Sequence, residues 1–179
     1  MLSDIDIFEI GNLVVFHSIT TGTVVAVLLT AFLLLMSAFA SGSEIAFFSL
    51  STQDLDELEP DKNSYDEKIQ QLRNDSERTL ATILITNNLV NVTIIMLCNY
   101  IFGSLVQFKV EWLEFVVITV LLTFMLLLFG EIMPKIYSRQ APLKFCRKVV
   151  SGIIFLRKLF WTFATILIKS GMIAEKAVP

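Results

Sequence analysis

Three short polar clusters interrupt long apolar stretches of this chain, and they hold the residues best suited to bind a cation. The clusters are SAFASGSE, TNNLVN and GEIMPK, and their candidate ligands are Ser37, Ser41, Asn87, Asn91, Gly130 and Glu131. The two serines are four residues apart, as are the two asparagines, so on a helix each pair shares one face. Hydroxyl, amide and carboxylate oxygens suit Mg²⁺ or Ca²⁺, whereas the lack of His and Cys argues against zinc or copper.

Pro134 is expected to add a backbone ligand to this set. Proline has no N–H and clashes with the carbonyl group four residues earlier, which is that of Gly130. The sequence therefore predicts a kink at Pro134 and a free carbonyl oxygen at Gly130.

A purely structural interpretation of these residues stays open. Serine and glycine in membrane helices commonly allow close packing, and asparagine commonly forms hydrogen bonds between helices. Glu131 weighs against this interpretation, because an ionisable residue inside a span is costly and usually functional. Glu44 lies nearer to the water, so a helix-pairing role is at least as plausible for it as a metal role. No role is expected for His17.

The apolar stretches that carry the clusters predict an all-α integral membrane protein. The expected spans are 23–50, 79–108 and 115–130, the last continuing towards Tyr137, and each supplies the ~20 residues that cross ~30 Å of hydrocarbon. The chain is 55% hydrophobic and only 17% charged, which is fewer charges than in a soluble domain. We therefore expect residues 23–140 to form a three-span transmembrane domain.

Basic residues predict how this domain is oriented. Residues 1–22 contain no Lys or Arg, and the connection between the second and third spans contains only Lys109. The loop 51–78 has four basic residues, and nine more follow the third span's apolar stretch. By the positive-inside rule, 1–22 is extracytoplasmic, and the loop and C-terminus are cytoplasmic in a multi-pass inner-membrane protein. The N-terminus lacks the positive region of a cleaved signal peptide, so we expect the first span to remain.

The two cytoplasmic segments are expected to be helical. In the loop 51–78, Pro60 separates two surface helices with modest apolar faces, and Ser76 would cap the second span; a disordered linker is the alternative. Residues 141–179 predict an interfacial amphipathic segment, because a fourth span would bury Arg157 and Lys158 near its middle. Its aromatic residues Phe160, Trp161 and Phe163 would reach the acyl boundary. Its expected contacts with anionic lipid head groups are Lys144, Arg147, Lys148, Arg157 and Lys158.

Several classes of function are disfavoured. The net charge is −3, and no basic patch is interleaved with aromatic residues, so nucleic-acid binding is not expected. No nucleophile–base set or glycine-rich phosphate loop is evident, so the chain is not expected to be an enzyme. Cys98 and Cys146 would lie on opposite sides of the membrane, which disfavours a disulfide within the chain.

The segments SGSEIAFFSLS, LATILITNNLVNV and FGEIMPKIYSRQ, in this order on successive spans, resemble the transmembrane domain of the CorC/CorB and cyclin M family of magnesium transporters. The resemblance covers about residues 37–140. It implies a homodimer with a Mg²⁺ site in each protomer, built by the six candidate ligands above. It also implies Na⁺-coupled export by alternating access, and a cytoplasmic CBS-type nucleotide-binding module in the full-length protein.

A second function from another class remains open. The polar clusters could only hold helices together in a non-transporting membrane scaffold, whose partner would be a protein of a secretion or motility complex. A response to millimolar Mg²⁺ separates the two hypotheses, because a scaffold should show none.

Overall fold

The computed structural model describes residues 14–16, 18–108 and 111–177, and this part of the chain has an all-α membrane fold. Its three spans are α2 (Thr21–Phe48), α5 (Ser76–Leu105) and a continuous third span over Trp112–Gln140. The third span joins α6 (Glu111–Met125), the π-helix η1 (Leu126–Ile132) and α7 (Met133–Gln140). The predicted fold class is thereby confirmed. Residues 1–13 and His17, on which other expectations rest, lie outside the described residues.

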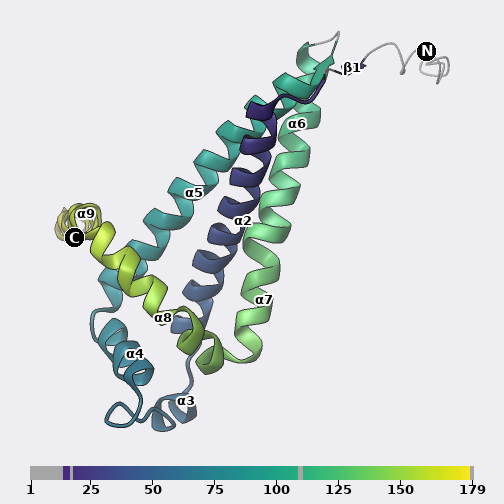
Figure 1. Cartoon of the computed structure of the whole chain (residues 1–179). Helices are drawn as coiled ribbons and strands as arrows, with labels where there is room; N and C mark the ends of the chain where they lie inside the picture. The colour runs from purple at the N-terminus through teal and green to yellow at the C-terminus, as the bar shows by residue number, and fades with distance from the viewer. Residues whose placement is uncertain (1–13, 17, 109–110, 178–179) are drawn as a thin grey trace, which may run out of the picture.

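The first span is the central helix of the bundle, because α2 packs along α5 and also along η1 and α7 (Figure 1). The α2 face that points into the bundle is made of small residues, including Ala26, Ser37, Ala40 and Ser41, all of them buried. Small side chains let membrane helices approach closely where apolar surface alone gives no driving force. This close approach brings the polar clusters of the three spans within reach of one another.

A short antiparallel ribbon joins the ends of the first two spans, and the sequence did not predict it. Strand β1 (Val14–Phe16) pairs with β2 (Val106–Phe108), with Val14 opposite Phe108 and Phe16 opposite Val106. The second span therefore ends at Leu105, because the backbone at Val106 is already extended, with φ −134° and ψ 124°. The ribbon lies at the opposite end of the bundle from α3 (Thr52–Asp56) and α4 (Ser64–Asn74) (Figure 1).

The loop between the first two spans contains two helices, as predicted. Ser51 and Asp54 form a reciprocal capping box at the start of α3. The expectation that Ser76 caps the second span is wrong, because Ser76 is the first residue of α5 and Asp75 occupies the cap position. The Asp75 carboxylate makes no capping bond to the backbone, since it pairs with Arg78 and Arg157 instead.

The C-terminal segment forms two helices, α8 (Pro142–Leu159) and α9 (Trp161–Ala177). They are apolar enough together to be counted as one broken span, but they meet at an angle of 79°, which excludes a straight fourth crossing. The basic residues of α8 share the helix with a buried apolar stripe at spacings of three and four residues. The stripe consists of Leu143, Cys146, Val149, Val150, Ile153 and Leu156.

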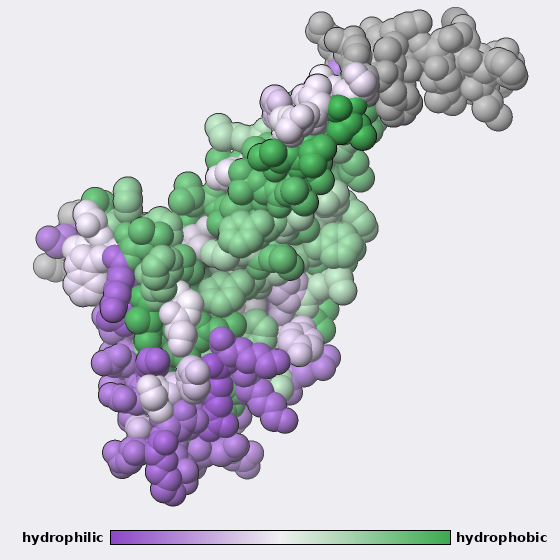
Figure 2. Space-filling model, in the orientation of Figure 1, coloured by the Kyte–Doolittle hydropathy of each residue, from purple (hydrophilic) through white to green (hydrophobic). Residues whose placement is uncertain are grey.

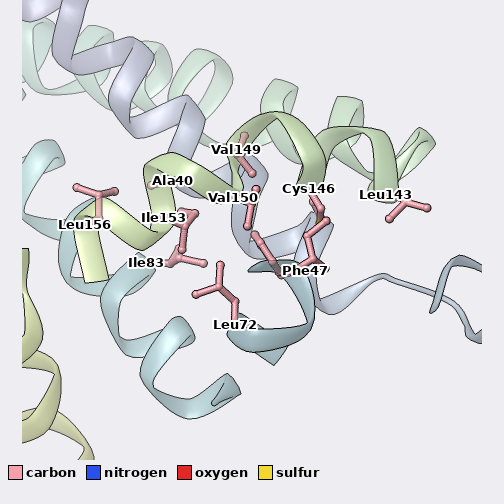
Figure 3. Packing of buried hydrophobic residues seen from close by; sticks show 12 residues of the cluster. Ala40, Phe47, Leu72, Ile83, Leu143, Cys146, Val149, Val150, Ile153 and Leu156 are labelled. Carbon is pink, nitrogen blue, oxygen red and sulfur yellow. The ribbon is translucent and has the colours of Figure 1, made fainter. Parts of the chain in front are cut away.

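The α8 stripe packs into the main hydrophobic core, at one end of the bundle. Phe47 from α2, Leu72 from α4 and Ile83 from α5 meet it there (Figure 3). Burial raises the pKa of the Cys146 thiol to about 12, so this thiol stays protonated at neutral pH. Above this core, Figure 2 shows a broad band of hydrophobic side chains over the spans, with hydrophilic residues gathered around α3 and α4.

Candidate intramembrane cation site

The structure brings the predicted ligands from three spans to one level of the bundle. Ser37 and Ser41 lie on the buried face of α2, with no exposed surface. Asn87 and Asn91 approach them from α5, one helical turn apart. Gly130 and Glu131 approach from the π-helical part of the third span. The spacing of four residues on α2 and on α5 therefore does align each polar pair towards a common centre.

Hydrogen bonds connect the serines to the asparagines. The Ser37 hydroxyl lies 2.6 Å from Oδ1 of Asn91 and 3.1 Å from Oδ1 of Asn87. The Ser41 hydroxyl lies 3.3 Å from the same Asn87 oxygen. A hydroxyl has one proton to donate, so Ser37 cannot make two full hydrogen bonds to the two amide oxygens. The cluster therefore has more oxygen lone pairs than protons to share between them. Oxygen lone pairs without a hydrogen-bond donor are able to coordinate a cation.

Glu131 is joined to the cluster through Asn91. The Asn91 amide nitrogen lies 3.4 Å from Oε1 of Glu131, a long hydrogen bond in which the amide donates. Asn91 therefore accepts from Ser37 and donates to Glu131. In the described part of the chain, no Lys or Arg forms an ion pair with Glu131.

The nearest lysine along the helix is used elsewhere, and sequence analysis missed this pairing. Lys135 lies one turn beyond Glu131, yet its ammonium group lies 3.3 Å from the Glu44 carboxylate on α2. Glu44 is thus held in a helix-pairing contact. The sequence did contain a signal for this pairing. Glu44 follows Ser41 by three positions and Lys135 follows Glu131 by four, so both lie about one turn beyond a candidate ligand.

The third span reaches the cluster with its backbone. A Cβ atom added at Gly130 would lie 3.0 Å from the Ser37 hydroxyl oxygen, so a side chain here would crowd Ser37. Pro134 cannot donate the bond that an α-helix would provide to the Gly130 carbonyl. The helix responds with a π-helical stretch, in which the Met133 N–H bonds the Leu128 carbonyl, and the span remains continuous. Such wide turns interrupt the regular backbone ladder, often at functional sites.

The five basic residues expected at lipid head groups divide into two kinds. Arg147 donates two hydrogen bonds to Asp66, at 2.7 and 2.9 Å, and Arg157 pairs with Asp75. Asp66 is 1% exposed, and Arg147 holds the pKa of its carboxyl below the usual range. The charges of both arginines are therefore used inside the protein. The other three, Lys144, Lys148 and Lys158, are exposed on α8.

A second network at the start of α5 was also not predicted. The Arg78 guanidinium lies 3.7 Å from the centre of the Trp161 ring and donates to the Thr165 hydroxyl at 3.2 Å. Trp161 is half exposed, so only part of this ring is free to meet lipid. The stacked cation attaches the start of α9 to the second span.

Fold and site together define a multi-span helical membrane domain with an oxygen-rich polar centre between its spans. Residues 28–178 match the family described as the cyclin M transmembrane N-terminal domain, and the chain belongs to this family, as the motifs indicated. It is also similar to the UPF0053 inner membrane protein YfjD of Escherichia coli (strain K12), with 31% identity over 110 residues. That match covers 61% of this chain and 24% of the relative, so the matched part is about a quarter of the relative's length.

Proposed function

We propose that this domain carries Mg²⁺ across the membrane through the polar centre between its spans. The observation that supports the proposal is the position of Glu131, a carboxylate inside a span that contacts Asn91 and forms no ion pair in the described part of the chain. A charge there needs a partner, because an unpaired carboxylate in a membrane interior is costly. A cation coordinated by Glu131 and the neighbouring oxygens meets this need.

The ligand set favours Mg²⁺ among the common metals. Its proposed members are Ser37, Ser41, Asn87, Asn91, the Gly130 carbonyl and Glu131. All offer hard oxygen atoms, and Mg²⁺ commonly keeps several of its waters beside one or two carboxylates. No group of three His, Cys, Asp or Glu residues capable of holding a metal occurs among the described residues. A zinc- or copper-type site therefore has no candidate in this part of the chain.

The mechanism we propose is alternating access coupled to Na⁺. A single carboxylate leaves bound Mg²⁺ with a net charge of +1, so binding is weak enough for release. Na⁺ can compete for the same oxygens, and this competition would couple its entry to Mg²⁺ export. The short side chains at the contacts of α2 with α5 and with η1 would let these helices shift against one another.

The test is a Mg²⁺ titration of the purified domain in detergent, followed by calorimetry and by thermal unfolding. We expect saturable binding in the millimolar range or tighter, with a matching rise in unfolding temperature, because a ligand that binds only the folded state stabilises it. Sodium should weaken the binding by competition. If Mg²⁺ changes neither the calorimetric signal nor the unfolding temperature, the scaffold hypothesis is supported instead.

We further propose that the domain works as a homodimer. A groove of about 560 Å³ lies between α5 and α6, and among the apolar side chains that line it are four polar ones, Asn99, Glu114, Thr119 and Thr123. These groups would be costly against lipid, and a second copy of the chain can cover them. Light scattering corrected for detergent measures this directly, and a particle with the mass of one 20.2 kDa chain would contradict it.

For the orientation, we propose an outside N-terminus and a cytoplasmic C-terminus in the inner membrane. The asymmetry of basic residues supports this arrangement. A CBS-type regulatory module on the cytoplasmic side would be placed to act on α8 and α9. A cysteine introduced at Glu175 should react with a membrane-impermeant thiol reagent only after the membrane is opened. Labelling of this cysteine in intact cells would contradict the proposed orientation.

A further inference from the structure

A cavity of about 360 Å³ lies at the corner where the third span turns into α8, and none of the residues that line it belongs to the polar centre. Tyr137 and Gln140 form one wall from α7, and Lys144, Phe145 and Lys148 form the other from α8. The corner lies near the border between the hydrophobic band and the hydrophilic end of the molecule (Figures 1 and 2). A ligand here would meet both apolar and charged groups.

The positive charge of the cavity comes from two lysines. Lys144 and Lys148 are exposed and lie one turn apart on α8, so their ammonium groups can reach the same ligand. Neither forms an ion pair with a residue that the structure describes. Arg147 also borders the cavity, but its charge is matched by Asp66 at 2.7 Å. The cavity therefore presents two lysine charges that no residue described by the structure neutralises.

Packed aromatic rings give the cavity a firm base. The Tyr137 and Phe145 rings meet edge to face, with centroids 6.2 Å apart and planes at 70°. Phe145 is in turn seated against the backbone of α2, since a Cβ atom added at Gly42 would lie 2.7 Å from its Cζ atom. Gly42 leaves the space that this ring fills. The walls are thus held by contacts within the protein.

An apolar track leads away from the cavity along the third span. Tyr137 is 63% exposed, and Met133, one turn earlier on α7, is 53% exposed. Phe129 continues the direction in η1 and is 47% exposed. These side chains extend from the charged cavity into the part of the span that hydrocarbon surrounds. A hydrophilic anion such as free phosphate would gain nothing from contact with these apolar side chains.

We propose that this corner is a binding site for one anionic phospholipid per chain. Its phosphate lies between Lys144 and Lys148, and its acyl chains follow Tyr137 and Met133 along the third span. Two lysines at one membrane-facing cavity match a single anionic head group, and the adjoining apolar track distinguishes a lipid from a soluble anion. The inference does not depend on Mg²⁺ transport, and it concerns a different set of residues.

The experiment is native mass spectrometry of the domain in detergent, titrated with phosphatidylglycerol, phosphatidylcholine or glycerol 3-phosphate. We expect one phosphatidylglycerol per chain to bind in preference to phosphatidylcholine, and glycerol 3-phosphate not to displace it. Lys144→Gln with Lys148→Gln should weaken phosphatidylglycerol binding about 25-fold, because each basic residue near an anionic lipid contributes about fivefold. Both side chains are exposed, so the variant should fold; circular dichroism and gel filtration check this.

Lys158→Gln is the matched control, since Lys158 is an exposed lysine of the same helix outside this cavity. It should leave phosphatidylglycerol binding within about twofold of the parent, well below the change expected for the pair. A loss of about fivefold in the Lys158→Gln control would equal the loss per lysine in the double variant, and it would show a general charge effect in place of a site. Displacement by glycerol 3-phosphate at the same concentration as the lipid would show a small-anion site and overturn the proposal.

Discussion

Glu131→Gln is expected to weaken Mg²⁺ binding by a factor of at least ~100, because it removes the one charged ligand of the proposed site. Losing one partner of a fully buried charge pair costs ~3–5 kcal/mol, and the partly buried Glu131 should lie near or below the lower end of that range. Glutamine keeps the volume of the side chain and can still accept a hydrogen bond from the Asn91 amide, which lies 3.4 Å from the carboxylate. The substitution therefore removes the charge and leaves the packing of the third span unchanged. Calorimetric titration of the two proteins side by side measures the difference.

Two controls separate a ligand role from a general effect of charge or polarity. Glu44→Gln removes a carboxylate that Lys135 already neutralises at 3.3 Å, so Mg²⁺ binding should change far less. Asn87→Ala should weaken binding, whereas Asn88→Ala, on the exposed face of the same helix, should not. If Glu131→Gln binds Mg²⁺ as tightly as the parent, Glu131 is a structural acid and the scaffold hypothesis gains.

Asp66→Asn is expected to lower the free energy of unfolding by about 2–3 kcal/mol, somewhat less than for a fully buried ion pair, because Arg147 remains about a third exposed. Asp66 is buried, and its carboxylate accepts both Arg147 hydrogen bonds and one from the Glu59 N–H at 3.2 Å. Losing the charge leaves the guanidinium without its ionic partner at the contact between α4 and α8. Thermal or denaturant unfolding in detergent measures the loss.

The pH dependence of this loss has a defined sign. Arg147 lowers the pKa of Asp66 in the folded protein, so the pair stabilises fully above the unfolded pKa of ~3.9 and loses its effect as pH falls through the lower, folded pKa. The difference between parent and variant should be constant above pH ~5 and shrink below pH ~4. Asp61→Asn, at an exposed position of the same loop, should change stability little at any pH. A loss of stability that is independent of pH would contradict an ionic origin.

The amino-acid sequence by itself determined the three spans and the residues that meet between them. Long apolar stretches must be helical in a bilayer, because every backbone polar group needs an internal partner there. The spacing of four residues places Ser37 with Ser41, and Asn87 with Asn91, on single helix faces. The spans follow from the lipid surroundings and the shared faces follow from local helix geometry, so neither prediction needed knowledge of the fold.

Only the tertiary structure decided which charges are paired and which helical form the third span takes around Gly130. Lys135 follows Glu131 by one turn, yet it pairs with Glu44, because the neighbouring helix α2 brings that carboxylate within 3.3 Å. The sequence predicted Arg147 as a lipid contact, but in the structure α4 places the buried Asp66 beside it. These partners are 81 to 91 positions apart in the chain, and no periodic pattern reports such distances. The backbone around Gly130 is a similar case. Pro134 predicts that the regular helix ladder is interrupted, but only the folded structure shows that the helix widens into a π-helix and the span stays continuous.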